Sequence, residues 1–94
     1  MATLAKAKAG HDKDRVYLVL EESDEFCLVA DGKYKLVSAP KRKNKRHLQV
    51  IKKMPDQEEL SALLAKFDQG EALNDTEVKR VITLYKTCRR DEDV

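Results

Sequence analysis

The densest group of residues able to do chemistry is a basic segment at residues 41–47. Its sequence is Lys41-Arg42-Lys43-Asn44-Lys45-Arg46-His47. Five of its seven side chains carry a full positive charge and none carries a negative charge. Such a cluster neutralises phosphates and releases their counterions, with arginine able to form two hydrogen bonds where lysine acts as a point charge. The segment predicts an anionic partner, against the alternative of a solvated basic loop.

The other polar residues do not suggest catalysis. His11 and His47 have no partner at a spacing that indicates a catalytic or metal site. Cys27 and Cys88 lie far apart in apolar segments, so we expect buried free thiols in a reducing compartment. Three glycines leave little room for a loop that cradles phosphate. We therefore expect no enzymatic activity, no cofactor, no metal ion and no small-molecule substrate.

Aromatic side chains that stack on unpaired bases are scarce, because Phe, Tyr and Trp make up 5% of the chain. Phe67 and Tyr85 fall on apolar helical stripes, and Phe26 is expected in the interior of a sheet. For Tyr17 and Tyr34, a core position and an outward stacking surface both stay open. This scarcity favours recognition of phosphates and folded shape over sequence-specific reading of single strands.

Charge is divided unevenly along the 94 residues. Residues 1–53 hold 13 Lys and Arg against 7 Asp and Glu, a net of +6, and residues 54–94 hold 6 against 10, a net of −4, which together give +2. This division predicts that the first half meets the anionic partner. The longest apolar run, Val16–Leu20, is far shorter than the roughly 20 residues that span a bilayer. We expect a cytoplasmic protein with no membrane partner.

Short alternating segments in the first half predict five strands, at residues 3–9, 16–20, 25–30, 34–38 and 48–52. The first strand would point Ala5, Ala7 and Ala9 into a tight interior. Asp31-Gly32 predicts a hairpin turn before the fourth strand, and Pro40 would end that strand. The basic segment would then be a loop. Five short strands predict a small closed barrel, because an open sheet leaves edges exposed.

The second half predicts two helices that begin at capping boxes. Asp56 with Glu59 would start the first helix, Gly70 would end it, and Asn74 with Glu77 would start the second. Their apolar stripes are Leu60, Leu63, Leu64 and Phe67, and Val78, Val81, Ile82, Tyr85 and Cys88. We expect an α+β fold, with a barrel at residues 1–54 and a helical hairpin at residues 55–94 packed on it as one domain.

A family resemblance emerges from an ordered set of segments. Lys8–Arg15, followed by an apolar strand, resembles the KOW motif of ribosomal proteins. The further matching segments are Leu28–Gly32, Lys33–Leu36, Pro40-Lys41 and Lys45–Leu48. Over residues 3–53 the chain thus resembles the bacterial (Firmicute) KOW-domain RNA-binding proteins, which are similar to the large-subunit ribosomal KOW proteins of eukaryotes and archaea.

The resemblance implies an SH3-like barrel that binds RNA, and ribosomal RNA in particular. In that family the turn after the first strand and the later basic loop face RNA. Asp14 stands where such motifs commonly carry a glycine, so the segment at residues 41–47 is the stronger site. The expected RNA-binding residues are Lys13, Arg15, Lys33, Lys35, Lys41, Arg42, Lys43, Lys45, Arg46 and His47.

A protein-interaction module is the alternative function. SH3-like barrels also bind proteins, and a fold alone does not settle function. A ribosomal or ribosome-associated protein would then meet the barrel or the helix pair, and could do so beside RNA. This alternative predicts that a helical stripe such as Leu60, Leu63, Leu64 and Phe67 stays partly exposed until a partner covers it.

Overall fold

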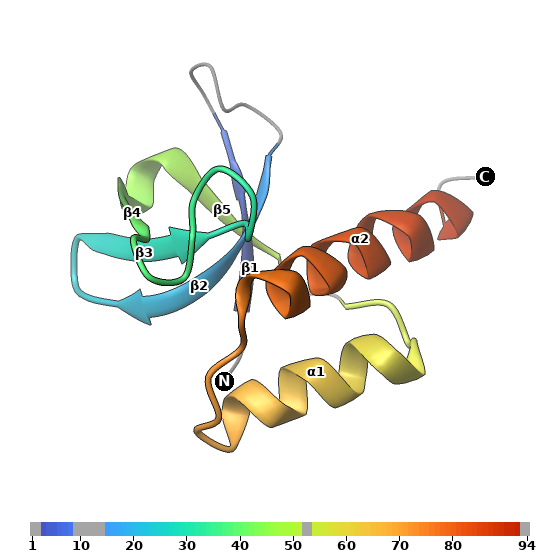
Figure 1. The fold of residues 1–94 in the computed structure, drawn as a ribbon. Coiled ribbons are helices and arrows are strands. Elements are labelled where there is room, and N and C mark those ends of the chain that lie inside the picture. Colours follow the sequence, from blue (N-terminus) through green and yellow to red (C-terminus); the bar gives the residue numbers. More distant parts are fainter. Residues whose placement is uncertain (1–2, 9–14, 52–53, 93–94) are drawn as a thin grey trace.

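The computed structural model of the chain describes residues 3–8, 15–51 and 54–92, with side chains described as far as residue 88. Its elements are β1 (Thr3–Ala7), β2 (Val16–Glu22), β3 (Phe26–Ala30), β4 (Lys41–Asn44), the 3-10 turn η1 (Lys45–His47), β5 (Leu48–Ile51), α1 (Glu58–Asp68) and α2 (Asp75–Glu92). The strands form one antiparallel sheet in the order β4-β3-β2-β1-β5. The sheet curls into a half-barrel and is followed by the two helices (Figure 1), which confirms the predicted α+β fold.

Alternation along the strands gives the sheet two faces with separate apolar clusters. Leu4 pairs with Leu18, and Ala5 pairs with Tyr17, so the two pairs point to opposite faces. The second cluster consists of Ala5, Ala7, Tyr17, Cys27, Val29 and Leu48. It joins β3 to β5 although two strands lie between them, so the sheet curls around this cluster. The predicted inward positions of Ala5 and Ala7 are confirmed, and Ala9 lies outside the described residues.

The curl stops at a half-barrel, short of the closed barrel expected from the sequence. β4 and β5 end the strand order on opposite sides, and no ladder joins them in the part of the chain that the structure describes. β4 and β5 have only four residues each, and η1 occupies the three residues between them. The outer edges of β4 and β5 therefore have no strand partner among the described residues.

The predicted fourth strand at residues 34–38 is wrong, and the strand lies instead at Lys41–Asn44. The Asp31 carboxylate oxygen Oδ1 accepts hydrogen bonds from the backbone N–H groups of Lys33, Tyr34 and Lys35 at 2.8–2.9 Å. The Val37 N–H donates to the Asp75 carboxylate at 2.7 Å. These carboxylates take donors that a strand would need for its ladder. The segment forms a turn, and Pro40 precedes β4 rather than ending a strand.

The helix starts agree with the sequence at α2 and differ by one residue at α1. At α2, Asn74 Oδ1 accepts from the Glu77 N–H at 2.8 Å, and Glu77 Oε1 accepts from the Asn74 N–H at 3.1 Å, which confirms the capping box. At α1 the cap is Gln57 rather than Asp56, because Gln57 Oε1 accepts from the Leu60 N–H at 2.6 Å. Glu59 does not reach back to a cap, because its carboxylate bonds the Arg80 guanidinium.

Both helices pack against the outer face of the curl. The first cluster combines Leu4, Val16 and Leu18 of the sheet with Leu60, Leu73, Val78, Val81, Ile82, Leu84 and Tyr85. The remaining α1 stripe residues Leu63, Leu64 and Phe67 are partly buried against it. Two ion pairs at 2.8 Å, Lys66 with Glu77 and Arg80 with Glu59, join α1 to α2. The sheet and the helices therefore share one core. The alternative function as a protein-interaction module stays a prediction.

Candidate functional site

The basic segment predicted as a loop is an edge strand followed by a tight turn. Among the described strands, β4 pairs with β3 alone, with Lys41 opposite Val29 and Lys43 opposite Cys27. Charged side chains are tolerated here because the outer side of an edge strand faces water, and lysines discourage further strand pairing. Lys41, Arg42, Arg46 and His47 are exposed, whereas Lys43 and Lys45 are half-buried.

Strand alternation divides the cations of β4 between two directions. Lys41 and Lys43 share a face with the residues of the curl interior, and Arg42 lies on the opposite face beside Leu28. The Arg42 guanidinium carbon lies 3.7 Å from the centroid of the Phe26 ring. Phe26 is half-buried under this cation and shares the face opposite Cys27, so its predicted place in the barrel interior is wrong. The cations therefore form a ridge around the sheet edge.

The turn after β4 is fixed by local hydrogen bonds and one ion pair. Asn44 Oδ1 accepts from the Arg46 N–H at 2.9 Å, and the Lys45 N–H donates to the Glu25 carbonyl at 2.9 Å. Lys45 Nζ lies 2.8 Å from Glu22 Oε2. This hydrogen bond lowers the pKa of Glu22 and raises that of Lys45. Lys45 is thus partly neutralised, while Arg46 is presented at the surface.

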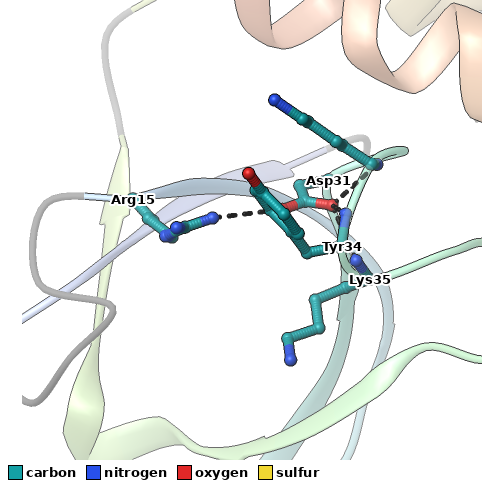
Figure 2. A network of polar contacts seen from close by, with 5 residues as sticks. Arg15, Asp31, Tyr34 and Lys35 are labelled. Carbon is teal, nitrogen blue, oxygen red and sulfur yellow. Dashed lines mark hydrogen bonds and ion pairs between the residues drawn. The ribbon is translucent and has the colours of Figure 1, made fainter.

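A second group of predicted residues gathers around the turn after β3. The Arg15 guanidinium reaches from the start of β2 toward Asp31, with its Nη1 3.9 Å from Asp31 Oδ2 (Figure 2). Two cations lie close to the centroid of the Tyr34 ring. The Arg15 guanidinium carbon is 4.7 Å from the centroid, and the Lys33 ammonium nitrogen is 5.0 Å from it. Of the two orientations left open for the tyrosines, Tyr17 is buried at 0% exposure and Tyr34 is 60% exposed.

Two further cations from α2 face this turn and were not predicted from the sequence. Lys79 and Lys86 line a groove of about 270 Å³ together with Arg15, Lys33 and Tyr34. The signal for them was present, because Lys79, Thr83 and Lys86 are spaced i, i+4, i+7 and share one helix face. The sequence could not show that this face meets the turn at residues 31–35.

The ten predicted residues therefore separate into distinct groups. Residues 41–47 form the ridge at β4 and η1, and Arg15 and Lys33 line the groove. Lys35 belongs to the same turn but is not among the residues that line the groove. Lys13 lies outside the described residues.

The thiols and acids of the described residues offer little reactive chemistry. Cys27 lies in the curl interior, where burial raises the pKa of its thiol and disfavours the nucleophilic thiolate. Among the described residues, no group of three His, Cys, Asp or Glu side chains is arranged to hold a metal ion. Among the described helices, none combines the length and the apolar character that crossing a membrane requires.

Comparison with protein-family models and with curated proteins finds no match to this chain. The candidate sites therefore rest on geometry and charge. The ridge offers exposed cations to an extended anionic surface, and the groove offers cations around an exposed ring.

Proposed function

We propose that this chain is a non-enzymatic RNA-binding protein of the cytoplasm that associates with the ribosome or with translation. It contacts the phosphate backbone of structured RNA through the ridge at residues 41–47. The observation that carries the proposal is the row of exposed Lys41, Arg42, Arg46 and His47 along an edge strand and its following turn. The resemblance of residues 3–53 to KOW-domain proteins points to the same partner.

The ridge suits phosphates better than base edges. Arg42 is held against Phe26, which leaves its guanidinium in a fixed place instead of sampling many rotamers. Arg46 follows a hydrogen-bonded cap and is likewise presented by a defined turn. Cations presented along a sheet edge match the regular backbone of a folded RNA, which proteins recognise through shape and phosphates.

The test is a salt series of binding to purified ribosomes and ribosomal RNA. If four phosphates are neutralised, log K should fall with log salt at a slope of about −3 to −4. The variant Lys41→Gln/Arg46→Gln removes two exposed cations and spares Lys45, whose ammonium is paired with Glu22. We expect weaker binding and a slope shallower by about 2, since each phosphate contact contributes about 1.

A matched control separates a local effect from a change in total charge. Ala62→Glu/Ala65→Glu also lowers the net charge by two, but on the exposed side of α1. This control should bind with a slope close to that of the parent protein. The proposal would be contradicted if both variants lost RNA affinity equally. It would also be contradicted if the RNA affinity of the parent protein did not change with salt.

A further inference from the structure

We propose that the groove between α2 and the turn at residues 31–35 binds one unpaired nucleotide of an RNA strand, with the base stacked on Tyr34 and its phosphates held by Lys79 and Lys86. The inference rests on the proposed function for its class of partner, but it uses residues outside the ridge. It adds recognition of a single-stranded nucleotide to the recognition of folded backbone.

Tyr34 has the surroundings of a stacking platform. Its side chain is 60% exposed, whereas Tyr17 and Tyr85 are 0% and 7% exposed. Two cations lie against the ring, with Arg15 at 4.7 Å and Lys33 at 5.0 Å from the centroid. An exposed aromatic ring flanked by cations is the combination with which proteins bind unpaired bases and their phosphates together.

The platform is held in place before any ligand arrives. Asp31 Oδ1 accepts three successive backbone N–H groups of the turn, including that of Tyr34 itself at 2.8 Å. Asp75 at the start of α2 accepts the Val37 N–H, which ties the far side of the turn to the helix. A turn whose backbone is already fixed loses less conformational entropy on binding, so stacking on Tyr34 yields more net affinity.

Charge in the groove favours phosphate. Arg15, Lys33, Lys79 and Lys86 line it, against a single acid, Asp31. One oxygen of that acid is saturated by backbone donors and the other faces Arg15. Among the described residues, neither Lys79 nor Lys86 belongs to an ion pair. Both ammonium groups thus remain available to an incoming anion.

The size and shape of the groove fit one nucleotide rather than a duplex. Its volume of about 270 Å³ lies just below the usual range for small-molecule sites. Buried Val16 and Ile82 line it and supply an apolar floor for a base. Lys79 and Lys86 are seven residues apart, about 10 Å along the helix, so they can hold phosphates on either side of the stacked base.

The experiment follows the tyrosine ring signals of the full chain by NMR during titration with hexauridylate, an RNA without base pairing. The chain has three tyrosines and no tryptophan, so each ring can be assigned. We expect the Tyr34 signals to shift while those of Tyr17 and Tyr85 stay in place. Tyr34→Leu should weaken hexauridylate binding at least about fivefold, and Tyr34→Phe should retain it, because stacking needs the ring and not the hydroxyl.

Further variants test the phosphate contacts and separate this site from the ridge. Lys79→Gln/Lys86→Gln should weaken hexauridylate binding and reduce its salt dependence. Lys41→Gln/Arg46→Gln should weaken binding of structured RNA, whereas saturating hexauridylate should still shift the Tyr34 signals of this variant. Failure of the ridge proposal would therefore show only with structured RNA, and failure of the groove proposal only with hexauridylate.

Three results would overturn the inference. The first is a Tyr34 signal that does not move at saturating hexauridylate. The second is unchanged affinity in Tyr34→Leu with the Tyr17 and Tyr85 signals preserved. The third is uridine monophosphate binding as tightly as hexauridylate, which would make the groove a site for free nucleotides and not for an RNA strand.

Discussion

Gly32 lies where the turn after β3 meets the first turn of α2. Its φ is +78°, and a Cβ atom at this position would lie 2.2 Å from the Asp75 carbonyl oxygen. We expect Gly32→Ala to destabilise the fold by about 3 kcal/mol or more, because backbone strain adds to a clash with backbone that cannot rotate away. Urea denaturation measures the change.

Gly70 supplies the control for this prediction. Its φ is +93° as the residue that ends α1, and a Cβ atom there would meet nothing within 4 Å. Gly70→Ala should therefore cost only the conformational strain, about 1 kcal/mol. If the two substitutions lowered the free energy of unfolding equally, the close approach of the turn to α2 would not matter for stability.

The residue scale also shows which side-chain roles were readable from the sequence. The stop at Gly70 and the cap at Asn74 depend on neighbours in the chain, and both were predicted. The exposure of Tyr34 depends on Asp31 capturing the backbone donors around it, which no periodic pattern reveals. Its apolar neighbours alternate like a strand, so the pattern favoured the wrong structure.

At the scale of elements, the start of α2 is joined to α1 by a titratable side chain. The Glu77 carboxylate accepts from Lys66 Nζ at 2.8 Å and from the Asn74 N–H. These bonds, with Lys66 the larger cause, lower the pKa of Glu77. A pKa lower in the folded state than in the unfolded state stabilises the fold above the unfolded value, about 4.3, and this contribution disappears as the pH falls through the folded value.

Glu77→Gln should therefore be less stable than the parent protein at neutral pH, and the difference should shrink below about pH 4. Urea midpoints at neutral and acidic pH measure it. Glu58→Gln is the control, since Glu58 is an exposed acid of α1 outside the ion pairs of the described residues. A Glu77→Gln difference that stays constant across this pH range would contradict the assignment.

The misplaced fourth strand shows why a fully polar edge strand escapes prediction, whereas the other edge strand, β5, was predicted at residues 48–52 and lies at Leu48–Ile51. Lys41–Asn44 contains no apolar residue, so it lacks the alternation that marks a strand. It forms a strand because β3 offers a backbone edge and because the cations can face water. The inner strands β1 to β3 lie close to their predicted positions in the chain, since their alternation reflects burial on two faces.

At the scale of the whole molecule, the candidate site was only half predictable. The cations at residues 41–47 are contiguous, so the ridge was visible in the sequence even though its structure was not. The groove combines Arg15 from the start of β2, Tyr34 from a turn and Lys79 from α2. Such a site exists only after the helices dock on the sheet, and docking is decided by tertiary packing that local patterns do not encode.

This shared packing leads to a prediction about cooperativity. Leu4, Val16 and Leu18 bury one face of the sheet against residues of α1 and α2 in a single cluster. We expect the sheet and the helices to unfold together, with the Tyr17 ring signal and the helical circular dichroism changing at the same denaturant concentration. Leu18→Ala, at a side chain with 0% exposure, should shift both transitions equally by about 2–5 kcal/mol.

Leu36→Ala provides the same chemical change at a side chain that is 39% exposed, and it should alter stability by no more than about 0.5 kcal/mol. Two separate transitions in the parent protein would mean that the barrel and the helical hairpin fold independently. In that case the groove would depend on a weak contact between two units, and Leu18→Ala would move only the sheet transition. A single transition would instead mean that Tyr34 and Lys79 keep a fixed position relative to each other. The turn that carries Tyr34 and the helix that carries Lys79 would then unfold only together.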